Sequence, residues 1–148
     1  MKVVVVTGTP GTGKTLIAKK LAKKSKYLYV DVKKLIKNFR LNEKFDKKRK
    51  SWIVDINKLN KILIEIIKLS KYEKANGVVF DSHLAHYLPN KYVDLCIVTR
   101  TKTKKLFSRL KKRGYSVSKI KENLEAEIMQ IILEEARQRK HKIKVIYT

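Results

Sequence analysis

Apolar and polar positions along this chain predict strands that alternate with amphipathic helices. An uninterrupted apolar run at residues 3–7 is typical of a central strand buried on both faces. Residues 14–24 follow with apolar positions at helical spacing, which places Leu16, Ile17 and Leu21 inward and the lysines outward. A buried strand followed directly by such a helix indicates an α/β fold built around a parallel sheet.

The same alternation continues to the end of the chain. Further strands are expected at residues 27–31, 78–81, 92–99 and 143–147, and helices at 55–71 and 102–113, with a short helix around Leu35 and Ile36. Ser118 is expected to cap a last helix, whose apolar face would carry Ile120, Leu124, Ile128, Ile131 and Ile132. Residues 42–51 are polar and are expected to be irregular. The prediction is a three-layer α/β fold over residues 1–148, one domain with about five parallel strands flanked by helices.

Composition adds few constraints beyond this fold class. The 148 residues suffice for one well-packed core. Apolar runs stay far below the ~18 residues needed to cross a bilayer, so no membrane partner is expected. The single cysteine, Cys96, allows no intramolecular disulfide and fits a reducing compartment. A cytoplasmic protein is expected, with a nuclear location open for a eukaryotic source.

The charge of the chain is strongly positive. Lys and Arg total 37 against 13 Asp and Glu, a formal net charge of +24. Such a field attracts polyanions, of which nucleic acid is the most abundant in a cell. Of the basic residues 30 are Lys and 7 are Arg, which is also the outcome of codon bias in an AT-rich genome. Both interpretations, RNA contact and codon bias, remain open.

Residues 8–15, Gly-Thr-Pro-Gly-Thr-Gly-Lys-Thr, match the P-loop pattern G-x-x-x-x-G-K-[ST] in full. Backbone N–H groups of such a loop surround phosphate oxygens, and the positive end of the following helix points at the same anion. Lys14 would contact the β- and γ-phosphates, and the Thr15 hydroxyl would bind Mg²⁺. The motif lies between a buried strand and an amphipathic helix, so the sequence predicts a site for ATP and Mg²⁺.

An acidic residue complements this loop. The predicted strand at residues 78–81 ends on Asp81. A carboxylate at the tip of a strand next to the P-loop strand holds Mg²⁺, directly or through water, in P-loop proteins. Asp81 is therefore the predicted Walker-B acid, with Thr15 as the other metal-binding residue.

Several segments together resemble one family. The chain lacks the Asn-Lys-x-Asp signature of guanine binding. It resembles the adenylate kinase isoenzyme 6 family, P-loop nucleoside monophosphate kinases implicated in small-ribosomal-subunit maturation. The segments that carry the resemblance are the P-loop, Asp81-Ser82-His83, Arg100-Thr101, Arg109-Leu110, Arg113-Gly114-Tyr115, Lys119-Ile120-Lys121-Glu122-Asn123 and Glu127-Ile128.

The resemblance implies a role for each matched residue. The residues expected around the ATP phosphates are Gly11, Gly13, Lys14, Thr15 and, through its backbone, Leu16. His83 would lie beside the transferring phosphoryl group, or only hydrogen-bond a backbone group. Arg113 would be the lid arginine on ATP, and Arg109 a second lid contact or part of a solvated helix face. A monophosphate-binding flap would span residues 31–54 and a lid residues 112–122.

The chain also departs from the family pattern. Leu84 stands where a glycine is expected after Asp-x-His. The flap position expected to hold an acceptor-gripping arginine is Lys37, with Arg40 three residues later; Asp31, Lys37 and Arg40 are the predicted acceptor-binding residues. Lysine keeps the charge but not the two-pronged grip. The resemblance further implies a final helix after the strand at 143–147, which the 148 residues do not contain.

The expected function is Mg-ATP-dependent phosphoryl transfer to a nucleoside monophosphate, ATP and AMP giving two ADP, with weak ATP hydrolysis. A link to small-subunit maturation, through a ribosomal protein and rRNA, is implied by the resemblance. Two alternatives stand beside it. One is an assembly or RNA-binding factor gated by ATP, whose kinase activity is incidental, and the other is a kinase of the same fold acting on a different small acceptor.

Overall fold

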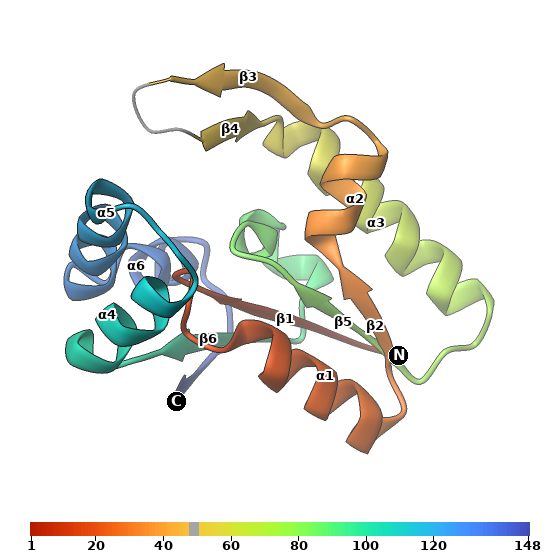
Figure 1. The fold of residues 1–148 in the computed structure, drawn as a ribbon. Helices are drawn as coiled ribbons and strands as arrows, with labels where there is room; N and C mark the ends of the chain where they lie inside the picture. Colours follow the sequence, from red (N-terminus) through yellow and green to blue (C-terminus); the bar gives the residue numbers. More distant parts are fainter. Residues whose placement is uncertain (48–50) are drawn as a thin grey trace.

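A computed structural model describes residues 1–47 and 51–148, and the architecture is an α/β sandwich (Figure 1). Among these residues, five strands form one parallel sheet in the order β2-β5-β1-β6-β7. The strands are β1 Lys2–Gly8, β2 Leu28–Asp31, β5 Gly77–Asp81, β6 Leu95–Arg100 and β7 Ile143–Tyr147. The predicted fold class is confirmed.

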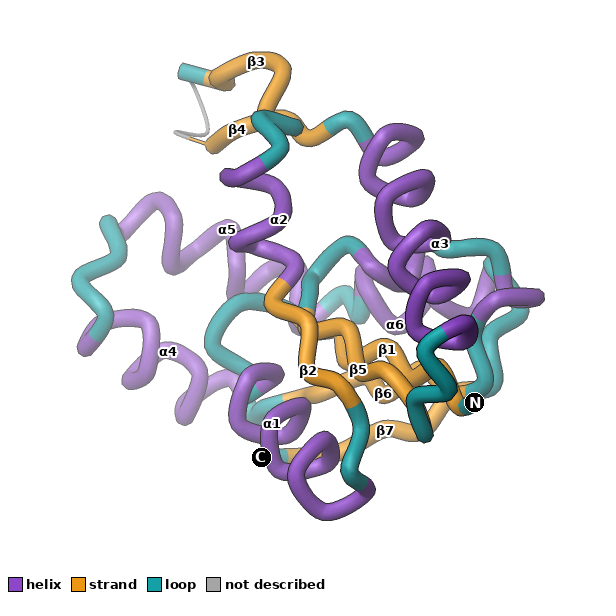
Figure 2. The backbone as a smooth tube through the Cα atoms, turned by 90° about the vertical axis from the view of Figure 1, so that its right-hand side faces the viewer, coloured by secondary structure: helices purple, strands orange, loops and turns teal. Residues whose placement is uncertain are grey.

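Helices cover both faces of the sheet. They are α1 Lys14–Ser25, α2 Val32–Asn38, α3 Ile56–Tyr72, α4 Thr103–Lys112, α5 Val117–Ile128 and α6 Ile131–Gln138, with short 3-10 turns at Ala85–Tyr87 (η1) and Asn90–Tyr92 (η2). Figure 2 shows α1 on one side of the strands and α3 on the other. Successive side chains of β1 therefore enter different cores, Val3 and Val5 with α2, α3 and α6, and Val4 and Val6 with α1.

The α4–α5 pair has a small apolar cluster of its own. Leu106, Leu110 and Ile120 are buried together, and Tyr115 and Leu124 pack against them. This cluster is separate from the two cores on the sheet, so α4 and α5 form a unit attached beside the carboxyl ends of the strands (Figure 1).

The region expected to be irregular forms a hairpin. β3 Asn42–Asp46 pairs antiparallel with β4 Ser51–Val54, and their register shifts between Asn42 and Lys44. The prediction was wrong because a charged two-stranded ribbon lacks the strict apolar alternation of a half-buried strand. Residues 48–50, part of the basic run, lie outside the described residues.

The strand predicted at 92–99 begins later, at Leu95. The N–H groups of Tyr92 and Val93 are used locally in the turn after Pro89, donating to the carbonyls of Pro89 and Asn90. Asp94 then accepts from the backbone N–H of Val3 at 2.8 Å, which fixes the start of β6 against β1.

The single C-terminal helix expected through Ile132 is two helices. Gln130 adopts a left-handed conformation with φ 55°, which ends α5, and the carbonyl of Glu127 in its last turn accepts from Arg100 at 2.7 Å and from the N–H of Gln130 at 3.1 Å. Ile128 and Ile131 are consequently exposed. The cap is Ser116 rather than Ser118, since Ser116 Oγ accepts from the N–H of Lys119 at 3.2 Å.

Leu16 was also assigned wrongly to the inward face of α1. It is 71% exposed, and the helix instead rests on the sheet through Ala18 and Ala22. Two small residues four apart let the helix approach the strands closely, and Leu16 falls on the other side of it. Within the described part of the chain, no helix is long and apolar enough to span a membrane.

Candidate active site

The P-loop follows the central strand and ends at the first turn of α1. Gly13, the residue before α1, has φ 85° and ψ 24°, and Gly11 has φ 90°. A side chain is strained in this left-handed region, and a Cβ on Gly11 would lie 2.8 Å from Leu106 Cδ1 of α4. Glycine at both positions lets the loop turn back over the start of α1, where backbone N–H groups and the helix N-terminus favour an anion.

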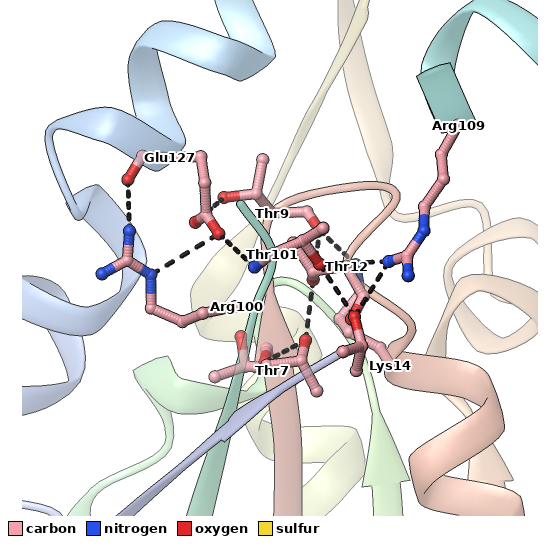
Figure 3. A network of polar contacts seen from close by, with 10 residues as sticks. Thr7, Thr9, Thr12, Lys14, Arg100, Thr101, Arg109 and Glu127 are labelled. Carbon is pink, nitrogen blue, oxygen red and sulfur yellow. Dashed lines mark hydrogen bonds and ion pairs between the residues drawn. The ribbon is translucent and has the colours of Figure 1, made fainter. Parts of the chain in front are cut away.

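Threonine hydroxyls hold this loop in shape. Thr12 Oγ1 donates to the carbonyl of Thr9 at 2.6 Å and lies 2.7 Å from Thr99 Oγ1, which in turn donates to the carbonyl of Thr7 at 3.2 Å (Figure 3). All four residues are buried. These bonds attach the loop to β1 and β6.

Lys14 lies across the P-loop. Its Nζ donates to the carbonyls of Gly8 at 3.0 Å and Thr9 at 3.4 Å. Burial lowers the pKa of Lys14 to about 8; the carboxylates of Asp81 and Glu127 oppose this shift, and Arg113 and Lys33 add to it. The ammonium is charged at neutral pH and is available to a phosphate that displaces the two carbonyls.

This pKa predicts how ATP affinity changes with pH. Bound phosphates favour the charged amine, so ATP binding raises the pKa of Lys14, and affinity is fully present below about pH 8 and declines above it. Between about pH 7.5 and pH 9 we expect ATP affinity, measured by calorimetry, to fall about tenfold. Lys14→Arg remains charged over this range and should bind with little dependence on pH. A wild-type affinity that is equally flat would contradict the assignment.

Asp81 and Thr15 form the acidic part of the site. Thr15 Oγ1 donates to Asp81 Oδ2 at 2.7 Å, and the hydroxyl of Tyr29 donates to the same oxygen at 2.6 Å. Burial and the hydrogen bond to Asp81 raise the pKa of Tyr29, so the phenol stays protonated as a donor. Tyr29 is a contact that the sequence prediction missed.

The residues present fit a magnesium ion. Hydroxyl and carboxylate oxygens are the ligands this ion prefers, and it commonly takes one or two protein oxygens while phosphates and waters complete its shell. No cluster of three or more His, Cys, Asp or Glu side chains that could hold a metal ion occurs in the described part of the chain. Thr15 and Asp81 are the side chains that would hold it.

Two cavities meet at the P-loop. One of about 610 Å³ is lined by Gly11, Gly13, Lys14, Thr15, Leu16, Lys19, Arg109, Arg113 and Thr148. The other, of about 330 Å³, is lined by Pro10, Lys14, Thr15, Asp31, Lys33, Ile36, Asp81, Ser82, His83, Arg113 and Tyr115. Both cavities share Lys14, Thr15 and Arg113. Two charged ligands, one in each cavity, would therefore meet at the same two cations.

His83 lies on the wall of the smaller cavity. The residue is partly exposed, and the protein around its imidazole, with the positive charge of Lys14, lowers the pKa of His83. The imidazole is therefore neutral at physiological pH and presents one donor and one acceptor nitrogen to the cavity.

The structure separates the predicted acceptor-binding residues. Asp31 lines the smaller cavity and also caps α2, accepting from the N–H of Lys34 at 3.3 Å. Lys37 and Arg40 are exposed and are not part of the wall of this cavity. Lys33, one turn before Lys37 on α2, lines it instead. The first turn of α2 starts at the carboxyl end of β2, which brings Lys33 to the wall of this cavity.

Arg109 is not on a solvated helix face. Its guanidinium donates to the carbonyl of Gly11 at 3.1 Å, to Thr101 Oγ1 at 3.1 Å and to Thr148 Oγ1 at 2.9 Å. Thr148 Oγ1 also donates to the carbonyl of Thr12 at 3.0 Å. Arg109 thus connects α4 to the P-loop backbone at the wall of the larger cavity, while Arg113, at the end of the same helix, is exposed and faces both cavities.

Comparison with known proteins agrees with this geometry. A family model described as an AAA domain matches residues 4–130. A putative adenylate kinase from Methanosarcina acetivorans is 44% identical over 132 residues, 88% of this chain and 69% of the relative. An adenylate kinase isoenzyme 6 homolog from Caenorhabditis elegans is 36% identical over 135 residues, 91% of this chain and 72% of the relative.

The chain belongs to the adenylate kinase isoenzyme 6 family. It is thus an adenylate kinase homologue, a P-loop nucleotide kinase among the phosphotransferases. The fold is shared more widely. A shikimate kinase structure from Bacteroides thetaiotaomicron superposes with a TM-score of 0.53 at 17% identity, covering 99% of this chain and 86% of the other.

Proposed function

We propose that this protein transfers the γ-phosphoryl group of Mg-ATP to a nucleoside monophosphate, with AMP as the expected acceptor and two ADP as products. The observation that carries the proposal is the pair of cavities sharing Lys14, Thr15 and Arg113. ATP would occupy the larger cavity beside the P-loop. The acceptor would occupy the smaller one, with its phosphate toward Lys33 and the shared cations.

The residues of the site would act mainly through charge. Phosphoryl transfer needs alignment and neutralisation more than covalent chemistry, and Lys14 and Arg113 lie where both phosphate groups would meet. Mg²⁺, held by Thr15 and Asp81, would supply further positive charge on the phosphates. Neutral His83 would accept or donate a hydrogen bond at the acceptor. Closure of the α4–α5 unit would exclude water, and incomplete exclusion would appear as weak ATP hydrolysis.

A panel of acceptors tests this function. Purified protein is incubated with Mg-ATP and each of AMP, CMP, GMP, UMP and shikimate, and the products are resolved by chromatography. ADP formed in a two-to-one ratio to AMP consumed supports the proposal. Rapid turnover with a different acceptor would favour the other small-molecule kinase, and ATP consumption without any acceptor product would contradict the kinase function.

The acceptor site gives a prediction that separates Lys33 from Lys37. Lys33 lines the smaller cavity and Lys37 does not, although the two lysines lie one turn apart on α2. Lys33→Ala should raise the KM for AMP about tenfold or more, the usual effect of removing a charged hydrogen-bond partner, and leave ATP affinity unchanged. Lys37→Ala is the matched control and should have little effect. Steady-state kinetics with each substrate varied decides between them.

A second function, an ATP-gated RNA-binding or ribosome-assembly factor, is supported by the net charge of +24. Exposed lysines follow the β3–β4 hairpin at Lys44 and Lys47, and the approach to the lid at Lys102, Lys104, Lys105, Lys111 and Lys112. These two groups belong to segments on either side of the active site, so the affinity for a bound polyanion would depend on whether the lid is open or closed.

Salt dependence tests the RNA function. Neutralising about 6 phosphates gives a log–log slope of binding against salt near −4 for single strands. Charge reversal to Glu at Lys44, Lys47, Lys104 and Lys105 should reduce that slope when an rRNA fragment is titrated at two salt concentrations. Unchanged affinity and slope would assign the charge to codon bias at these positions.

A further inference from the structure

The α4–α5 unit joins the core at two points that lie together. The chain enters the unit after β6, at Arg100 and Thr101, and leaves it at the end of α5, at Glu127. Because this unit has its own apolar cluster, its orientation relative to the sheet depends on what holds these two crossings and on the bond from Arg109 to the P-loop. Any movement of α4 and α5 relative to the sheet must therefore bend the chain at these two crossings, which we call the hinge.

One carboxylate joins both crossings to the P-loop. Glu127 is 5% exposed, and its two oxygens have different partners. Oε2 accepts from the backbone N–H of Thr101 at 2.9 Å and lies 3.5 Å from Nε of Arg100. Oε1 accepts from the hydroxyl of Thr9, in the P-loop, at 3.2 Å (Figure 3).

The surrounding bonds extend this connection. Arg100 donates through a second nitrogen to the backbone carbonyl of Glu127 at 2.7 Å, so the first crossing is bonded to both the side chain and the backbone of Glu127. The hydroxyl of Thr101 accepts from Arg109 on α4, and Arg109 also contacts the P-loop carbonyl of Gly11. Figure 3 shows these groups converging on the loop from different elements.

We propose that Glu127 is a positioning residue for phosphoryl transfer, which joins the hinge of the α4–α5 unit to the P-loop through Thr9 and Thr101. It lines neither cavity and acts through its hydrogen-bond partners, and its charge also helps to keep Lys14 protonated. With the connection intact, Arg109 and Arg113 are held at the phosphate cradle whose shape Thr9 helps to set. This inference rests on the proposed use of the P-loop for ATP.

The buried position of Glu127 has a reason in this role. A buried carboxylate beside a buried guanidinium loses hydration on folding, and an apolar pair of the same volume is often as stable. Here the carboxylate instead fixes the position of two segments relative to each other, because one oxygen accepts from Thr9 and the other from Thr101. Glu127 lies in the last turn of α5, which ends at Ile128, and α6 begins after the left-handed Gln130.

A double-mutant cycle on ATP affinity tests the proposal. Glu127→Gln keeps the volume and removes the charge, and Thr9→Val removes only the P-loop hydroxyl. Each should weaken ATP binding, Glu127→Gln about tenfold and Thr9→Val about threefold, and the double variant should be little weaker than Glu127→Gln, because both changes break one connection. Glu134→Gln, an exposed acid on α6, is the matched loss of charge and should bind as wild type.

Hydrogen exchange distinguishes positioning from stability. In Glu127→Gln the amides of α4 and α5 should exchange faster at least severalfold, while those of β1 and β5 remain as protected as in the wild type. Additive effects of the two changes, or faster exchange throughout the sheet, would overturn the proposal in favour of a purely structural ion pair. If Glu127→Gln fails to fold, the ATP affinity of Thr9→Val decides: wild-type affinity overturns the proposal, and weakened affinity supports it.

The failure of this proposal can be told apart from the failure of the proposed function. A wild-type protein that does not bind ATP would contradict the proposed function as well, whereas equal ATP binding by the wild type and the variants would contradict the role of Glu127 alone.

Discussion

Lys14→Ala should reduce phosphoryl transfer by ~10²-fold or more, the loss usual when a charge at a transferring phosphate is removed. Lys14 borders both cavities, and its ammonium donates to two P-loop carbonyls, those of Gly8 and Thr9. No apolar core contact depends on it, so the substitution changes the site rather than the fold. A loss of ~10²-fold corresponds to about 2.7 kcal/mol in the barrier.

The measurement is kcat/KM for ATP and AMP, with the unfolding temperature recorded in parallel. Lys20→Ala is the matched control, since Lys20 is exposed on the same helix and is not part of either cavity wall. It should retain activity. A Lys14→Ala variant that turns over like the wild type would overturn the placement of the active site at the P-loop.

Asp81→Asn should nearly abolish turnover and raise the Mg²⁺ concentration needed for half-maximal activity. The amide oxygen of asparagine can still accept from Thr15 and Tyr29, so the substitution removes the charge and largely preserves the geometry. The negative charge of Asp81 has two effects. It would attract the metal ion, and it also opposes the burial that lowers the pKa of Lys14.

Two comparisons make this result specific. Asp94→Asn is the control: Asp94 lies just before β6, at the other end of the sheet, where it accepts from the N–H of Val3, and the variant should keep the wild-type dependence on Mg²⁺. His83→Ala, at the wall of the smaller cavity, should lower turnover and keep ATP affinity. Activity of Asp81→Asn with an unchanged response to Mg²⁺ would exclude Asp81 as a metal-binding residue, and a His83→Ala variant that loses stability but retains specific activity would assign that histidine a structural role.

Local patterns determined much of this protein. The apolar run at 3–7 and the glycine spacing of the P-loop predicted the central strand, the loop and α1, because buried strands, phosphate cradles and helices are encoded by neighbouring residues. The position of Asp81 at a strand end followed from the same reasoning. That Asp81 lies close to Thr15 followed from the rule that the carboxyl ends of parallel strands lie at one edge of the sheet.

Errors arose where local pattern and tertiary contact compete. The apolar positions of residues 117–132 fit one helix, yet the left-handed conformation of Gln130 divides it, and Arg100 holds the carbonyl of Glu127 just before the break. The acceptor role expected of Lys37 from the sequence stays a prediction, while the start of α2 at the carboxyl end of β2 places Lys33 at the cavity. Leu16 fits an inward position by hydrophobicity, yet small side chains set the contact of α1 with the sheet.

The sequence by itself determined the fold class, the phosphate loop and the acid opposite it, since each depends on spacing within a few residues or on one rule of sheet geometry. The tertiary structure alone decided which distant groups support them. Tyr29 reaches Asp81 across 52 positions of the chain, and Glu127 reaches Thr9 across 118. The strand order β2-β5-β1-β6-β7 brings these residues together, and that order is set by how the helices pack on both faces of the sheet, which no local pattern contains.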